Sequence, residues 1–266
     1  MKISFLSDTH MSQPSPHPAD LLIHCGDLTG TGTVQQFKKL MPWLKSLRAK
    51  HPLGFLFVPG NHELGLDPAF VEKEWVKYDK DPFHNRKPAH KTADTEEILD
   101  LLRNAGITVL IDQAIEIEGV KFYGSPYTPE FKDWAFIKTF QELSVGWGKI
   151  PWDTKVLITH GPPRYIRDLL PVGEHVGDEA LARKVFELPE LKLHAFGHIH
   201  PDKGHRILKD KIFLNVSYMV DLGDQYGYAK NPDKLTPLYV VDTQSWEIHG
   251  ALEGEAPYLL DQLTTP

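Results

Sequence analysis

The chain has 266 residues, of which 41% are hydrophobic, enough for a sizeable core and too many for a disordered chain. No stretch approaches the roughly 18–20 consecutive apolar residues of a membrane-spanning helix, and the N-terminal apolar run is too short for a secretion signal. The net charge of −7, with scattered Lys and Arg, argues against long nucleic acid as a partner, and the single cysteine, Cys25, excludes an internal disulfide. We therefore expect a soluble cytoplasmic protein with no membrane association.

Short apolar runs alternate with amphipathic stretches along the chain. The pattern predicts buried strands at 3–8, 21–27, 54–60, 156–161 and 193–198, and helices at 33–50, 68–79, 94–106 and 178–188. Pro42 is expected to break or kink the first helix. Hairpins are predicted at 114–126, turning at Glu118-Gly119, and within 204–217 and 238–250. This order predicts an α/β fold with a mixed sheet. No linker separates a second domain, so we expect one domain over 1–250 and a tail over 251–266 that packs on it or is partly ordered.

Polar residues collect where the predicted strands end. In chain order they are Asp8 and His10, then Asp27, then Asn61 and His62, then His160, then His198 and His200. Ligands of α/β proteins bind beyond the carboxyl ends of strands. Any one of these fragments alone more often marks a turn or a structural histidine, but five in succession predict a site.

The donor set indicates the kind of site. Two carboxylates, one amide oxygen and four imidazoles, with no thiolate, suit Mn²⁺, Fe or Zn²⁺ rather than Ca²⁺. Seven ligands are too many for one open site, whereas two metal ions can share a bridging carboxylate. Asp27, in the middle of the set, is our choice for the bridge. Bound cations would also let a chain of negative net charge accept a small anionic substrate.

The ordered motifs D8-T-H10, G26-D27, G60-N61-H62-E63, H160 and G197-H198-I-H200 resemble those of the calcineurin-like metallophosphoesterase superfamily. The resemblance implies an α/β fold of two mixed β-sheets packed as a sandwich and flanked by helices. It also implies a dinuclear centre, Mn²⁺ being the first expectation and Fe or Zn²⁺ the alternatives. Carried over by position, Asp8, His10, Asp27 and His200 would hold one ion, and Asp27, Asn61, His160 and His198 the other.

The same resemblance implies phosphoester hydrolysis by in-line attack of a metal-bridging hydroxide, with Asp27 and His62 as the catalytic residues. His62 would lie beside the substrate and donate a proton to the leaving group, unless it only orients a phosphate. The stretch "GDLTGTG" lacks the Asp-Arg pair of the protein phosphatases, and the segments 123–131, 134–136, 159–163 and 197–204 resemble the metallophosphoesterase-domain-containing subfamily. We therefore expect a phosphodiesterase for small diesters, cyclic nucleotides included. The alternatives are a phosphomonoesterase or nucleotidase, and a metal-poor interaction scaffold on the same fold.

Substrate contacts are sought among side chains near the motifs. Tyr127, Phe131, Trp134 and Phe136 could form an aromatic wall for a base or could simply be core, and Arg164 could contact phosphate with its fork of donors. Cys25 is not expected to be a nucleophile, because no phosphate-binding loop follows it. The remaining histidines are expected at the surface: His17, His51, His84, His90 and His249.

Overall fold

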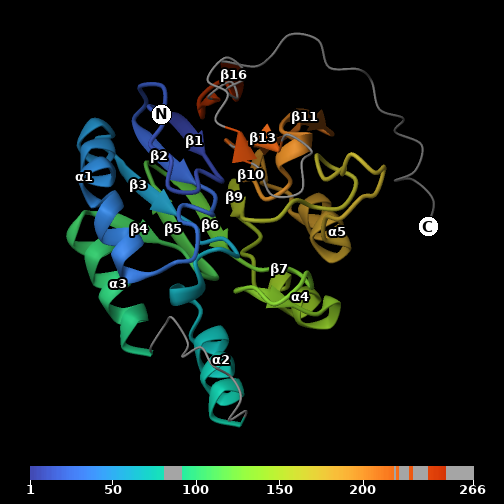
Figure 1. Ribbon diagram of the computed structural model, residues 1–266. Coiled ribbons are helices and arrows are strands. Elements are labelled where there is room, and N and C mark those ends of the chain that lie inside the picture. The colour runs from blue at the N-terminus through green and yellow to red at the C-terminus, as the bar shows by residue number, and fades with distance from the viewer. Residues whose placement is uncertain (81–91, 219, 222–227, 230–238, 250–266) are drawn as a thin grey trace.

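The computed structural model describes residues 1–80, 92–218, 220–221, 228–229 and 239–249. Most of its strands belong to two six-stranded sheets (Figure 1). The first has the order β16-β15-β1-β2-β3-β4 and consists of β16 (Glu247–His249), β15 (Val240–Asp242), β1 (Lys2–Leu6), β2 (Leu21–His24), β3 (Gly54–Phe57) and β4 (Ile107–Val109). The second has the order β11-β12-β10-β9-β6-β5 and consists of β11 (Gly204–Leu208), β12 (Lys211–Asn215), β10 (Leu193–Phe196), β9 (Val156–Thr159), β6 (Val120–Ser125) and β5 (Gln113–Ile117).

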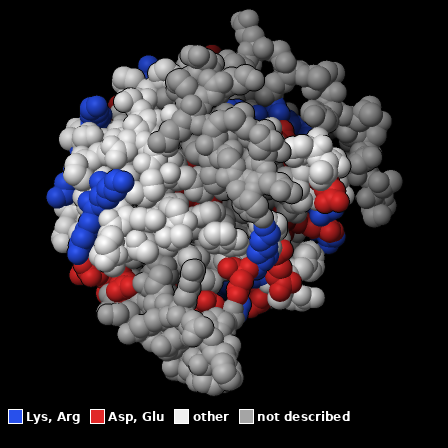
Figure 2. Space-filling model, viewed as in Figure 1, with Lys and Arg blue, Asp and Glu red and all other residues white. Residues whose placement is uncertain are grey.

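Each sheet has four parallel strands at its centre or one side, and the antiparallel strands lie at the edges. Two small pairs complete the described strands: β7 (Thr128–Pro129) with β8 (Ile137–Lys138), and β13 (Val220–Asp221) with β14 (Tyr228–Ala229). Within the described residues, no helix is both long enough and apolar enough to cross a membrane. On the face shown in Figure 2, Lys and Arg are dispersed among Asp and Glu rather than gathered in a stripe.

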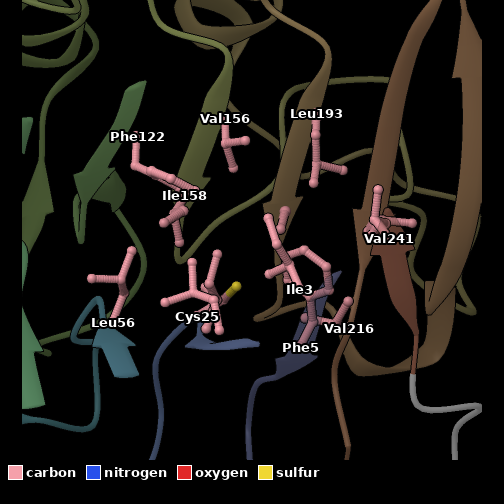
Figure 3. Packing of buried hydrophobic residues seen from close by; sticks show 14 of the residues in the cluster. Ile3, Phe5, Cys25, Leu56, Phe122, Val156, Ile158, Leu193, Val216 and Val241 are labelled. Atoms are coloured by element: carbon pink, nitrogen blue, oxygen red, sulfur yellow. The ribbon is translucent and has the colours of Figure 1, made fainter. Parts of the chain in front are cut away.

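Side chains alternate between the two faces of each strand, and this alternation builds three layers of core. Ile3 and Phe5 of β1 point between the sheets and meet Ile158 and Leu193 of the second sheet (Figure 3). The next residue, Leu6, points to the outer face instead. The interior between the sheets is therefore apolar, and the molecule is a β-sandwich.

Helices cover both outer faces. On the first sheet, α1 (Val34–Lys50) and α3 (Thr92–Asn104) pack against Phe55 and Phe57; on the second, α4 (Phe140–Trp147) and α5 (Glu179–Glu187) pack against Leu157 and Phe196. The remaining helical segments are α2 (Pro68–Lys80), η1 (Leu64–Leu66) and η2 (His200–Asp202). The α/β sandwich with flanking helices that the resemblance implied is confirmed.

The predicted elements are largely found, with two differences. The hairpin at Glu118-Gly119 is confirmed, both residues having positive φ (50° and 70°), as a tight turn between twisted strands requires. The helix α1 runs through Pro42 without a break, which corrects the expected interruption; this proline lies on the exposed side. The helix α4 was not predicted, although Thr139 and Glu142 form a capping box at its start.

The surface histidines are partly corrected. His17 and His249 are exposed, whereas His51 is 2% exposed. Its Nδ1 lies 2.7 Å from the carbonyl oxygen of Leu47, so the ring folds back on the last turn of α1 and is buried there. His84, His90 and the tail over 251–266 lie outside the described residues.

Candidate metal centre

The candidate site forms where the carboxyl ends of parallel strands from both sheets meet. The loops after β1, β2 and β3 approach those after β9 and β10, and a backbone bridge between Ser7 and Ser217 links the end of β1 to the chain after β12. Three overlapping groups of side chains there have ligand atoms within 4.8 Å of one another: Asp8, His10 and His200; His10, Asp27 and His62; Asp27, His160 and His198. The structure thus brings together all five motifs.

Asp27 lies at the centre of the cluster. Its Oδ2 is 3.5 Å from His160 Nε2, 3.7 Å from His10 Nε2 and 3.9 Å from His62 Nε2. At one end of the cluster, Asp8 Oδ1 lies 3.1 Å from His200 Nε2. At the other end, Asn61 Oδ1 lies 2.9 Å from His160 Nε2. The buried Asp27 carboxylate therefore faces imidazoles from both halves of the site.

The backbone of the site is strained where the ligand-type residues sit. Asp8, His10, Asp27 and His198 all have positive φ, at 53°, 40°, 55° and 69°, a conformation that costs non-glycine residues about 1–3 kcal/mol each. The loops are short and turn sharply directly after the strands, which aims these side chains inward. Strain of this kind gathers at functional sites and is held by the surrounding contacts.

Three glycines make room for the cluster. A Cβ on Gly26 would collide with His160 Nδ1, one on Gly60 with Asp27 Oδ1, and one on Gly197 with Ser7 Oγ and Asp8 Oδ2. These are the glycines of the GD, GNHE and GHIH motifs. Each motif therefore supplies a side chain of a metal-ligand type and, through its glycine, the space that a side chain from another part of the site occupies.

Charge in the site is balanced in the way that cation binding requires. Burial favours the neutral acid, yet His200 and His160 hold the pKa of Asp8 below its usual range. For Asp27 burial is likewise outweighed, by His160 and His62, and its pKa is also lowered. Burial lowers the pKa of His198 to about 3. The pKa of His160 is raised to about 9, because Asp27 and Asp8 outweigh its burial.

A divalent ion fits this set of groups. The carboxylates are ionised and the His198 imidazole is neutral, which are the states that bind metals. The proton on His160 Nε2, held against Asn61 Oδ1 at 2.9 Å, occupies a position that a cation would take over. The N/O donors suit Mn²⁺, Fe or Zn²⁺, and the glycine cradle leaves the space.

Glu63 is a residue of the site that sequence reasoning missed. It is fully buried and accepts four hydrogen bonds, from the backbone N–H groups of Asp27, Gly60 and Thr29 and from the Thr29 hydroxyl, at 2.7–2.9 Å. It therefore ties the loops after β2 and β3 together and holds the strained backbone of Asp27. The only signal in the sequence was a carboxylate directly after the Asn-His pair.

Asn215, at the end of β12, was also not predicted. Its Nδ2 donates to the carbonyl oxygen of Ile199, at 2.8 Å, and to that of Arg167, at 3.2 Å. Ile199 stands between the two histidines of GHIH, so this amide fixes the turn that separates them. Arg167 in turn donates to Asp202 and to the carbonyl oxygen of His205. Nothing in the local sequence marked either residue.

The residues considered as substrate contacts lie in different surroundings in the structure. The Trp134 ring lies 4.2 Å from that of His62 at an angle of 31°, beside the cluster. Phe136 is 2% exposed and belongs to the core, which is one of the two alternatives left open for it. Tyr127 faces Phe136 edge-on, and Lys138 Nζ lies 3.5 Å above its ring. The guanidinium of Arg164 lies 5.1 Å over Tyr165.

Comparison with known proteins agrees with this geometry. Residues 1–202 match the model of the calcineurin-like phosphoesterase family. Human metallophosphoesterase domain-containing protein 1 is 35% identical over 209 residues, which are 77% of this chain and 61% of that protein, so this chain spans under two thirds of that relative's length.

The similar solved structures include two for which most of both chains is covered. Phosphopantetheinyl hydrolase from Mycobacterium tuberculosis is 16% identical with a TM-score of 0.47, covering 81% of this chain and 88% of that one. A dimetal phosphatase from Danio rerio is 10% identical with a TM-score of 0.40, covering 83% and 87%. With the family model matching three quarters of its length and the motif residues gathered in one cluster, this chain belongs to the calcineurin-like phosphoesterase family.

Proposed function

We propose that this protein is a dinuclear, metal-dependent phosphodiesterase acting on small phosphodiesters, cyclic nucleotides among them. The observation that supports it most directly is the position of Asp27, whose Oδ2 lies 3.5–3.9 Å from the Nε2 atoms of three imidazoles. A buried carboxylate so placed is suited to bridge two cations. The other members of the cluster then divide into two sets, one on each side of it.

In this proposal, Asp8, His10 and His200 hold one cation with Asp27, and Asn61, His160 and His198 hold the other, with Mn²⁺ the first candidate for both. Two divalent ions, when bound, would ionise the attacking water at neutral pH and neutralise charge on the phosphoryl oxygens. The chain's own part is to fix these groups by strained loops, by Glu63 and by Asn215.

His62 is placed to manage the proton of the leaving group. Its Nδ1 lies 2.7 Å from the carbonyl oxygen of Gly30, and because a carbonyl only accepts, Nδ1 carries a proton. Its Nε2 is thereby turned toward the cluster, 3.9 Å from Asp27 Oδ2, where a proton held at Nε2 can pass to the leaving oxygen. Trp134 packs on the ring and limits its rotation. In this proposal Arg164 contacts a phosphoryl oxygen, and Tyr127 and Trp134 contact the organic part of the substrate.

The test compares hydrolysis of bis(4-nitrophenyl) phosphate with that of 4-nitrophenyl phosphate after chelation, with and without added Mn²⁺. We expect metal-dependent cleavage in which kcat/KM for the diester exceeds that for the monoester. A preference for the monoester would replace the proposal with a phosphomonoesterase or nucleotidase. Absence of metal after reconstitution would leave an interaction scaffold.

Two substitutions separate the roles. Asp27→Asn should lose bound metal and turnover together. His62→Ala should keep its metal content and lose roughly 10²–10⁴-fold in kcat, the usual worth of a general acid. His17→Ala, which changes an exposed histidine, is the matched control and should leave both unchanged. Full turnover by His62→Ala would remove the acid role and leave His62 as a residue that orients phosphate.

A further inference from the structure

A cavity of about 350 Å³ lies between the start of α2 and the segment 130–137 that joins β7 to β8. Ligand pockets of proteins begin at roughly 300 Å³, so this one has room for a single small organic group. Its walls include Asp67, Phe70 and Lys73 on one side and Phe131, Trp134 and Ile137 on the other.

Trp134 connects this cavity to the candidate metal centre. Trp134 lines the cavity and its ring lies 4.2 Å from the ring of His62, whose Nε2 lies 3.9 Å from Asp27 Oδ2. The cavity and His62 therefore share Trp134 as a neighbour. Under the proposed function, the cavity lies on the His62 side of the site, where a substituent of the phosphoryl group would be received.

The walls include aromatic surface on which a planar ring can stack. Phe131, Trp134 and Ile137 supply aromatic and apolar surface beside the charged side chains of the lining. Phe131 is 52% exposed, and Lys132 Nζ lies 5.0 Å from the centre of its ring. A ring stacked on Phe131 would remove that surface from water.

The charges of the lining argue against a second anionic group. Two cationic side chains, Lys73 and Lys132, face three acidic ones, Asp67, Glu130 and Asp133, which leaves a formal charge of −1. Lys73 Nζ lies 2.7 Å from Asp133 Oδ1 and is neutralised there. The lining is thus suited to an aromatic substituent without a negative charge.

The walls are held in place before any ligand arrives. The Lys73–Asp133 ion pair joins α2 to the segment 130–137. The same segment is anchored by the Phe136 N–H, which donates to Asp67 Oδ2 at 2.7 Å, and by the Ala135 N–H, which donates to the carbonyl oxygen of Asn61 at 3.3 Å. A preformed pocket spends little binding energy on ordering itself.

We propose that this cavity binds the planar aromatic substituent of the phosphoester, a nucleobase or an aryl ring, with Phe131 as its main determinant of specificity. The inference rests on the proposed function for the position of the phosphoryl group. The inference goes beyond the proposed function because it names the substituent of the phosphoester and the residues that select this substituent.

The experiment measures binding to Mn²⁺-reconstituted protein by calorimetry, using phosphonates because their P–C bond is not hydrolysed. The ligands are methylphosphonate, phenylphosphonate and an adenosine whose 5′-phosphate is replaced by a methylenephosphonate. We expect the two aromatic ligands to bind about tenfold or more tightly than methylphosphonate, which is the worth of one stacked ring.

Phe131→Ala should abolish most of this preference and leave the Kd of methylphosphonate unchanged, and Phe131→Tyr should restore the preference. Phe140→Ala is the matched control, because Phe140 is 49% exposed and does not line the cavity. If Phe131→Ala weakens binding of the adenosine ligand more than that of phenylphosphonate, the pocket is assigned to a nucleobase. If it weakens binding of phenylphosphonate alone, the pocket is assigned to an aryl group.

Equal affinity for methyl- and phenylphosphonate would overturn the inference, as would a preference that survives Phe131→Ala. These results are distinguishable from failure of the proposed function. A protein that binds aromatic phosphonates selectively but cleaves no diester keeps the pocket and loses the activity, and one that cleaves diesters with no aromatic preference does the reverse.

Discussion

Glu63→Gln tests whether the buried carboxylate below the candidate metal centre stabilises the fold through its four hydrogen bonds. One oxygen, Oε2, receives the N–H groups of Asp27 and Gly60, and Oε1 receives the N–H and hydroxyl of Thr29. A glutamine keeps one acceptor oxygen and turns an NH₂ group toward the other pair of donors. Two buried donors then lose their acceptor, at about 1–3 kcal/mol each.

From these contacts we expect a loss of about 3 kcal/mol in the free energy of unfolding. For a chain of this size that corresponds to a fall of roughly 6–12 °C in Tm. The measurement belongs at pH 8, where the carboxylate is ionised and accepts all four bonds.

The assay is urea unfolding of metal-free protein, followed by circular dichroism. Glu97→Gln is the matched control, because Glu97 is half-exposed and makes a surface ion pair with Lys38 that is worth about 0–1 kcal/mol. A loss below about 0.5 kcal/mol for Glu63→Gln, with the fold intact, would refute the reasoning, since the four bonds would then add nothing net to stability.

Three further predictions concern the space beside Gly197, the protonation of His194 and the effect of bound metal on Tm. Gly197→Ala places a Cβ against Ser7 and Asp8 and should weaken Mn²⁺ binding roughly 10–100-fold, whereas Gly146→Ala, whose Cβ meets nothing within 4 Å, should leave binding by calorimetry unchanged. Burial lowers the pKa of His194 to about 3, so below pH 6.5 this histidine is protonated in the unfolded chain and stays neutral in the folded one. Its contribution to the free energy of unfolding is complete above pH 6.5, and about 2 kcal/mol of stability is lost by pH 5. His194→Gln should flatten the fall in unfolding free energy between pH 7 and 5 by that amount, and an unchanged slope would contradict the assignment. Chelation should lower Tm by roughly 5–10 °C for each site filled at about 100 times its Kd, and a Tm unaffected by chelator would mean that the folded protein binds no metal.

The polar residues at the strand ends could be predicted from the sequence because each follows directly after an apolar run. Each apolar run ends in a short turn, and in an α/β protein such turns share one edge of a sheet. Asp8 and His200 could thus be assigned to one site although 192 positions separate them along the chain. That the strands divide between two sheets came from family resemblance, because strand pairing depends on contacts that the apolar runs do not encode.

The residues that hold the metal-ligand side chains in place could not be predicted. Asn215 acts through backbone carbonyls of residues that are distant in sequence, and no local pattern marks such a bond. Phe136 and Trp134, two positions apart, end in the core and beside His62 respectively. The positive φ of Phe136, 56°, changes the direction of the chain there, so simple alternation does not apply.

Cys25 gives the molecule an internal reporter of separation between its two sheets. It is the only cysteine of the chain, it is 0% exposed among the side chains packed between the sheets (Figure 3), and burial raises the pKa of its thiol. A disulfide reagent can react with it only after the sheets part, so its labelling rate in native buffer measures the free energy of that opening. Because the carbonyl oxygen of Cys25 also accepts the Nδ1 proton of His160, added Mn²⁺ should slow labelling by the same factor by which it stabilises the fold.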